Sequence, residues 1–198
     1  MAASMMRPLG RSGIQVSAMG LGCWAIGGPF WFGETPSGWG EVDDDESIRA
    51  IHAGLDLGIN FFDTSDVYGT GHSERVLAHA FEGRRDKVVI ATKFGNTFDE
   101  ATRQGTGSDA SPEYIRSACE ASLRRLNTDY IDLYQFHLNG YPPEKAAPVR
   151  DTLEELVAAG KIRAYGWSTD FPDSARVTTV FASSRILARC ASLRRLSA

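Results

Sequence analysis

The chain has 198 residues, of which 42% are hydrophobic and 23% are charged, and its formal net charge is −4. This composition excludes a disordered chain and is typical of one globular domain, long enough to bury a sizeable core. The weakly acidic balance also lacks the basic surface of a nucleic-acid binder. The three cysteines are scattered and show no C-x-x-C spacing. We therefore expect neither a disulfide framework nor a metal site, in a protein of the cytoplasm.

Residues 12–33 carry no charge and follow Arg7 and Arg11, as in a signal peptide or a membrane anchor. The segment holds six glycines and one proline, which break helices. A secretory or membrane-spanning segment needs an unbroken apolar run instead. We therefore expect no membrane association.

The N-terminal part predicts a hairpin followed by a long loop. Ser12-Gly13 marks a tight turn between two short extended segments, which favours a β-hairpin. Residues 25–43 form a predicted loop whose glycines and aromatic side chains favour a lid or a pocket wall. A second loop, rich in Gly, Thr, Asn and Asp, is predicted from about residue 95 to residue 110.

Downstream of residue 43, amphipathic helices alternate with short apolar strands. The segment 111–113 has the strongest helix start, because a capping serine, a proline and a glutamate follow one another. The other helices are predicted to begin at Asp43 to Asp45, at Ser73 and at Asp151. Strands begin near residues 60, 88, 130 and 162, each after a helix. This alternation indicates parallel strands in an α/β fold, but periodicity alone does not separate a barrel from a doubly wound sheet.

The composition changes near the C-terminus. Residues 176–198 contain five arginines and no Asp or Glu. This segment suits either a basic C-terminal helix or a tail that does not belong to the fold. We therefore divide the chain into a domain over residues 1–175 and a basic tail over residues 176–198.

Ionisable side chains gather where three of the predicted strands end. Asp63, Lys93 and His137 each stand at the end of a strand, and Tyr68 follows Asp63 by five residues. In parallel α/β folds, the carboxyl ends of the strands and the loops after them form the functional site. Each residue alone also suits a structural role, as a turn, a solvated cap or a satisfied core histidine. Their occurrence at successive strand ends favours a catalytic group.

These side-chain types suit the reduction of a carbonyl group. A tyrosine, with an unperturbed pKa of ~10, exchanges its proton poorly at neutral pH unless a neighbouring ammonium group stabilises the phenolate. An aspartate would keep that lysine charged, and a histidine would hold the carbonyl oxygen. The hydride has to come from a cofactor, because no side chain supplies one. The isolated G-x-G pairs do not make a Rossmann fingerprint.

These motifs resemble those of the aldo-keto reductases. The resemblance runs from about residue 7 to residue 172 through five ordered segments, LGRSGIQVSAMGLGCW, NFFDTSDVYG, VVIATKFG, DYIDLYQFH and GKIRAYGWST. It implies a (β/α)8 barrel of the TIM type that binds a nicotinamide cofactor, usually NADPH, with NAD possible. It also implies a catalytic tetrad of Asp63, Tyr68, Lys93 and His137, in which Tyr68 donates the proton.

The resemblance also implies a set of cofactor-binding residues, namely Gly22, Cys23, Trp24, Asp63, Ser168 and Thr169. Residues 22–24 match the end of the first barrel strand, at the floor of the pocket. Ser168-Thr169 stands where the family usually has Ser-Asn, whose side chains hold the nicotinamide carboxamide. Thr169 lacks the paired donor and acceptor of an amide, although a hydroxyl does either task.

Five barrel strands are recognisable, near residues 19–24, 60–64, 88–93, 130–137 and 162–168, and family-like strands six to eight are not. We therefore expect an incomplete barrel of about five of the eight βα units, for which a premature stop, a frameshift or a split gene would each account. An open arc exposes strand edges, so we expect a marginal monomer that oligomerises through these edges.

The function implied is the reduction of small aldehydes or ketones by an NADP-dependent oxidoreductase. Three alternatives remain open at this point. The chain is then an inactive remnant, a partner-dependent subunit, or a protein that senses the cofactor without catalysis.

Overall fold

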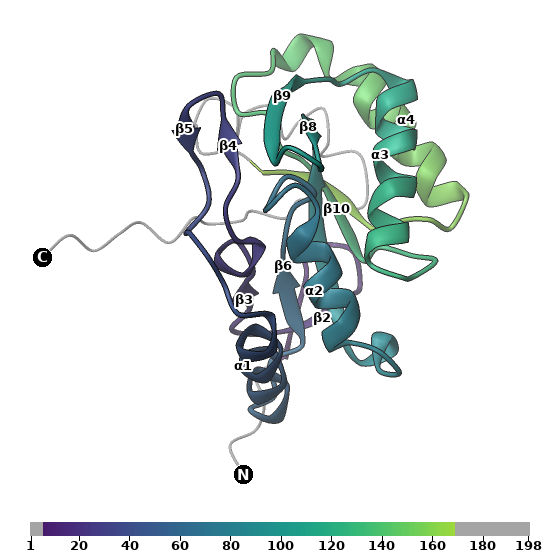
Figure 1. Ribbon diagram of the computed structural model, residues 1–198. Coiled ribbons are helices and arrows are strands. Elements are labelled where there is room, and N and C mark those ends of the chain that lie inside the picture. Colours follow the sequence, from purple (N-terminus) through teal and green to yellow (C-terminus); the bar gives the residue numbers. More distant parts are fainter. Residues whose placement is uncertain (1–5, 169–198) are drawn as a thin grey trace, which may run out of the picture.

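The computed structural model describes residues 6–168, and a five-stranded parallel sheet forms their centre (Figure 1). The strands lie in the order β11-β10-β7-β6-β3, and each pair of neighbours is parallel. Their bounds are β3 (Leu21–Gly22), β6 (Phe61–Asp63), β7 (Val89–Phe94), β10 (Leu133–Phe136) and β11 (Tyr165–Trp167). Each new strand thus adds beside the previous one, as successive units of a TIM-type barrel do. The predicted fold class is confirmed, and the tail 176–198 lies outside the described residues.

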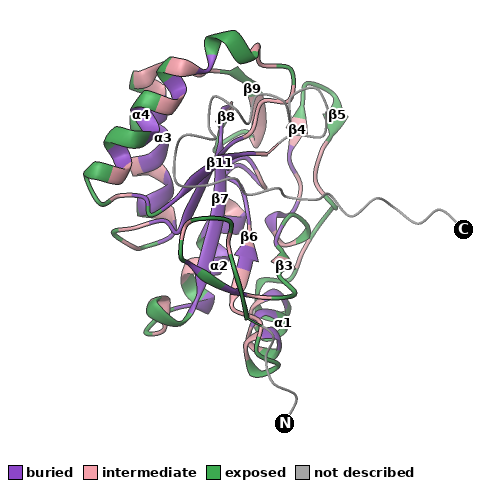
Figure 2. Ribbon diagram, turned by 180° about the vertical axis from the view of Figure 1, so that it is seen from behind, coloured by how far each residue is buried: buried purple, intermediate pink, exposed green. Residues whose placement is uncertain are grey.

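Four α-helices connect the strands: α1 (Asp44–Asp56), α2 (His72–Ala80), α3 (Pro112–Arg125) and α4 (Ala147–Ala158), with short 3-10 turns at η1 (Ala25–Gly27), η2 (Arg85–Lys87) and η3 (Pro143–Lys145). Helices α2, α3 and α4 lie on one face of the sheet (Figure 1), and the opposite view shows the buried strands from the other face (Figure 2). The larger apolar core fills the layer between the sheet and the helices. None of these helices combines the length and the apolar character that crossing a membrane requires.

The predicted helix starts are confirmed in two cases and wrong in two. Asp43 accepts a hydrogen bond from the N–H of Glu46, and the Ser111 hydroxyl accepts one from the N–H of Tyr114. Helix α2, however, is capped by Gly71 rather than by Ser73, whose hydroxyl serves the packing of the sheet instead. Helix α4 begins at Ala147, before Asp151, because a proline occupies its first turn.

The two predicted loops are wrong in part, because they pair with each other. Residues 25–43 supply β4 (Trp31–Phe32) and β5 (Thr35–Pro36), and residues 95–110 supply β8 (Asn96–Asp99) and β9 (Gln104–Ser108). These strands form a second sheet in the order β5-β4-β9-β8. A side chain at Gly105 would collide with the ring of Phe32, so the glycine permits this close approach. Pairing across about seventy residues of sequence leaves no local signal.

The predicted hairpin is confirmed as β1 (Met6–Pro8) paired with β2 (Gln15–Ser17). Ile14 and Val16 of the hairpin are buried in a second apolar cluster with Val89, Ala91, Leu133 and Ala164. These sheet residues alternate along their strands with residues of the larger core. The hairpin therefore covers the face of the sheet opposite the helices, near the amino ends of the strands.

A buried carboxylate ties the amino ends of three strands together. Asp132 precedes β10 and is fully buried. Its oxygens accept hydrogen bonds from Arg85 (2.7 Å), from Arg163 (2.6 Å) and from the backbone N–H of Ile90 (3.0 Å). The three donors belong to segments beside or within β7 and β11. Asp132 therefore fixes the register of three neighbouring strands at the end remote from the predicted site.

We predict that Asp132→Ala lowers the free energy of unfolding by about 3 kcal/mol, because it leaves buried donors without an acceptor. Urea denaturation followed by circular dichroism measures the change. Asp129→Ala, at a nearby exposed position, serves as the control and is expected to change stability little. Equal stabilities of the two variants would contradict the structural role of Asp132.

Candidate active site

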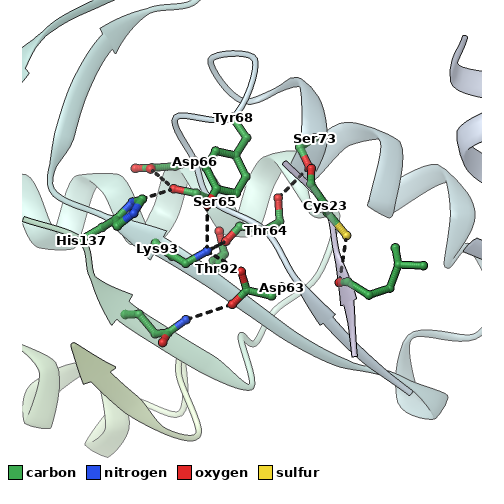
Figure 3. Close-up of polar contacts among 12 residues, drawn as sticks. Cys23, Asp63, Thr64, Ser65, Asp66, Tyr68, Ser73, Thr92, Lys93 and His137 are labelled. Carbon is green, nitrogen blue, oxygen red and sulfur yellow. Dashed lines mark hydrogen bonds and ion pairs between the residues drawn. The ribbon is translucent and has the colours of Figure 1, made fainter. Parts of the chain in front are cut away.

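Parallel pairing brings the predicted residues to one end of the sheet. Asp63 ends β6, Lys93 lies one residue before the end of β7, and His137 follows β10 directly. Because these strands are parallel neighbours, their carboxyl ends meet at one edge. Tyr68 comes from the turn between β6 and α2. Figure 3 shows the four side chains converging.

The turn that carries Tyr68 is held by a close backbone approach. Gly69 has a φ of +61°, and a Cβ atom there would overlap the carbonyl oxygen of Gly27. A Cβ atom on Gly27 would in turn lie 2.8 Å from the carbonyl carbon of Tyr68. Only glycine fits at these two places, so the pair fixes the position of Tyr68 over the strand ends.

The Lys93 ammonium is the centre of the site. Its Nζ atom donates to Asp63 Oδ1 at 2.5 Å, to the carbonyl oxygen of Thr64 at 2.8 Å and to the hydroxyl oxygen of Tyr68 at 3.3 Å. The side chain of Lys93 is only 3% exposed. All three donors of the ammonium group are therefore directed at oxygen atoms of the site (Figure 3).

The charge of Lys93 depends on these contacts. Burial on its own would lower the pKa of Lys93, but the negative charge of Asp63 and the oxygen of Tyr68 more than offset it, and the pKa is raised above its ordinary value. Lys93 is therefore a charged ammonium at neutral pH. The predicted proximity of residues 63, 68 and 93 is confirmed.

His137 stands on the other side of Tyr68. The two rings lie edge to face with centroids 6.3 Å apart, and His137 Nδ1 lies 3.5 Å from the hydroxyl oxygen of Ser65. Burial and the charge of Lys93 lower the pKa of His137 to about 4. The imidazole is therefore neutral at pH 7, with one nitrogen that donates and one that accepts.

Trp24 forms an aromatic wall beside the tyrosine. Its ring stacks on Tyr68 with centroids 6.1 Å apart and meets the edge of Trp39 at 5.6 Å. The indole N–H donates to the carbonyl oxygen of Ser37, which fixes the ring. Trp24 remains 44% exposed. The segment predicted as a pocket wall thus contributes aromatic surface next to Tyr68.

The other predicted cofactor residues differ in what they present. Gly22 pairs with Asp63, and a Cβ atom there would meet no other atom within 4 Å, so space is open beside the carboxylate. Cys23 is fully buried in the core on the helix side, where burial raises the pKa of its thiol, and its carbonyl oxygen accepts from Ser73. The backbone N–H of Ser168 donates to Phe136 at 2.8 Å. Thr169 lies outside the described residues.

One buried polar residue of the site has no place in the sequence-based prediction. Gln135, on β10, donates from its amide Nε2 to Asp63 Oδ2 at 3.4 Å. Strand alternation was the available signal, since Gln135 stands two residues before His137 in an otherwise apolar strand. A polar residue at such a position faces the same side as the catalytic candidate.

The comparison with known proteins decides the family. Residues 18–185 match the family model described as Aldo/keto reductase family, which is most of the chain.

The chain belongs to the aldo/keto reductase family.

Individual relatives agree. Aldo-keto reductase YhdN of Bacillus subtilis is 43% identical over 162 residues, which cover 79% of this chain and 44% of that protein. Aldo-keto reductase AKR11C1 from Bacillus halodurans, solved in its holo form, matches with a TM-score of 0.74 and 36% identity over 86% of this chain and 52% of that one. An aldo-keto reductase from Klebsiella pneumoniae, solved in complex with NADPH, matches with a TM-score of 0.65 and 31% identity over 85% and 51%. The chain spans about half the length of these relatives.

We predict that His137 resists protonation on acidification. Its folded pKa of about 4 lies below the ordinary 6.5, so between these values the unfolded chain binds a proton that the folded chain does not. Stability is then lost as the pH falls from about 6.5 to about 4, by an amount on the order of 3 kcal/mol.

Histidine-selective NMR titration measures the midpoint, with His137→Gln to assign the signal and His79→Gln as the matched control. In urea denaturation, His137→Gln should flatten the loss of stability between pH 6.5 and pH 4. A His137 midpoint near 6.5 would show that the site does not exclude the imidazolium.

Proposed function

We propose that this chain carries the catalytic site of an NADP(H)-dependent oxidoreductase that reduces aldehydes or ketones, with Tyr68 as the proton donor. The observation that carries the proposal is the buried Lys93 ammonium, which touches Asp63 on one side and the Tyr68 hydroxyl on the other. Membership of the aldo/keto reductase family supports the oxidoreductase class. The substrate would be a small carbonyl compound.

The residues present fit a nicotinamide ring. Space is open at Gly22, directly beside Asp63, and a half-exposed indole at Trp24 offers a flat apolar face. Ser168 lies after β11, two strands from β7, with a hydroxyl suited to a carboxamide. The nicotinamide group supplies the hydride when bound. A related structure from Klebsiella pneumoniae that holds NADPH supports this choice of cofactor over NAD.

The proposed role of Tyr68 is to give its proton to the carbonyl oxygen as the hydride reaches the carbonyl carbon. Lys93 donates to the phenol oxygen and has no acceptor of its own, so it does not take up the phenol proton. As the proton leaves, the ammonium stabilises the phenolate that forms. Asp63 holds the ammonium in place and keeps it charged. The products are an alcohol and a tyrosinate, which regains a proton from solvent.

His137 would orient the substrate. A neutral imidazole beside Tyr68 offers one N–H to the carbonyl oxygen without adding a second positive charge near Lys93. The carbonyl oxygen would then lie between the tyrosine hydroxyl and the imidazole. This arrangement directs both hydrogen bonds to the atom on which negative charge develops.

Two further expectations stay predictions. They are the location in the cytoplasm and an assembly of chains through strand edges. Within residues 6–168 the edge strands of the main sheet are β3 and β11.

The proposal is tested by titrating the full chain with NADPH while following tryptophan fluorescence, and then adding a test aldehyde. We expect quenching of fluorescence, because Trp24 lies in the site, and oxidation of NADPH on addition of the aldehyde. Binding without turnover would favour a cofactor-sensing protein instead. Absence of binding would favour an inactive remnant or a subunit that needs a partner.

We predict that Tyr68→Phe lowers kcat for aldehyde reduction by at least about 100-fold, because the proton donor is lost while the ring remains. The Kd for NADPH should change little. Steady-state kinetics and the fluorescence titration measure the two effects. Tyr130→Phe, on the opposite end of the sheet, is the matched control and should retain activity. Equal loss of binding and turnover would overturn the assignment of Tyr68 as proton donor.

A further inference from the structure

Gln135 occupies the middle of the site on the face of the sheet that Asp63 and Lys93 share. It pairs in register with Lys93 of β7 on one side and with Gly166 of β11 on the other. Its side chain is 1% exposed. Since Gly166 has no side chain, Gln135 is the bulkier residue of the two at this level of the sheet.

The amide nitrogen of Gln135 completes the environment of Asp63. Nε2 donates to Asp63 Oδ2 at 3.4 Å, while Lys93 occupies Oδ1. A carboxylate only accepts hydrogen bonds, so the NH2 end of the amide has to face Asp63. Both oxygens of Asp63 are therefore held, and the amide carbonyl is directed away from Asp63.

The carbonyl oxygen of Gln135 is buried and has no hydrogen-bond partner among the described residues. Native proteins seldom leave a buried acceptor unpaired, because the group has lost its water without gaining a donor. The Tyr134 hydroxyl is also unpartnered, but it lies in the helix-side core, where its ring stacks on Phe94. Gln135 differs because its unpaired atom lies on the face of the catalytic candidates.

We propose that Gln135 is a further binding and positioning residue of this site: its amide N–H fixes Asp63, and its carbonyl oxygen accepts a hydrogen bond from the nicotinamide half of the cofactor. That half carries donors of the required kind, the carboxamide NH2 and the ribose hydroxyls. The inference rests on the proposed function, because it assumes that a nicotinamide nucleotide is the ligand. It assigns to Gln135 a contact that a purely structural residue would not make.

The test compares the full chain with Gln135→Leu, which keeps the bulk of the side chain and removes both polar ends. Isothermal titration calorimetry gives the Kd for NADP⁺ and for nicotinamide mononucleotide, which is the nicotinamide half alone. We expect the substitution to raise both Kd values by about tenfold and by the same factor, because the lost contact lies in the shared half. Gln135→Met repeats the measurement with an unbranched side chain in case leucine does not pack.

Gln15→Leu, at an exposed position of the hairpin, is the matched control and should leave both Kd values unchanged. The urea midpoint without ligand should also be unchanged in Gln135→Leu or Gln135→Met, because the unpaired carbonyl makes no contact that would be lost.

Wild-type binding with unchanged Kd values in the variants would overturn the role of Gln135 and leave the proposed function intact. A loss of binding that follows a matching loss of stability would assign Gln135 a structural role and also overturn the inference. Failure of the wild-type chain to bind either nucleotide would overturn the proposed function, and the inference with it.

Discussion

A positive charge buried at the carboxyl ends of parallel strands governs this structure. An ammonium group loses several kcal/mol of hydration when it leaves water, and only well-placed oxygen atoms offset that cost. Lys93 finds them on Asp63, on the backbone of Thr64 and on Tyr68. The same contacts that make burial of the charge tolerable bring the phenol next to it, so stability and chemistry depend on one arrangement.

The scaffold places this charge by fixing both ends of the strands. At the amino ends, Asp132 binds donors beside or within β7 and β11, and the hairpin covers the apolar face. At the carboxyl ends, the close approach of Gly27 to Gly69 positions the turn that carries Tyr68. The register of the strands then leaves little freedom in the distance between Lys93 and its partners.

Local patterns in the sequence predicted most of the main sheet, the hairpin and the convergence of residues 63, 68, 93 and 137. These features follow from short-range signals: apolar runs, caps, turns and the rule that strand ends share a rim. The second sheet was missed because β4 and β9 pair across a long separation, with Gly105 making room for Phe32. Gln135 was missed because a single polar residue in a buried strand carries meaning only once its neighbour Asp63 is placed.

The protonation of Lys93 tests the account most directly. Lysine-selective NMR follows Lys93 through a pH titration in the wild-type chain and in Asp63→Asn, with Lys87, Lys145 and Lys161 as internal references. Since Asp63 raises the pKa of Lys93 against the effect of burial, wild-type Lys93 should be more than half protonated at pH 10.5, its ordinary midpoint. In Asp63→Asn it should lose its proton below that pH. The same midpoint in both chains, or a wild-type midpoint below 10.5, would contradict the account.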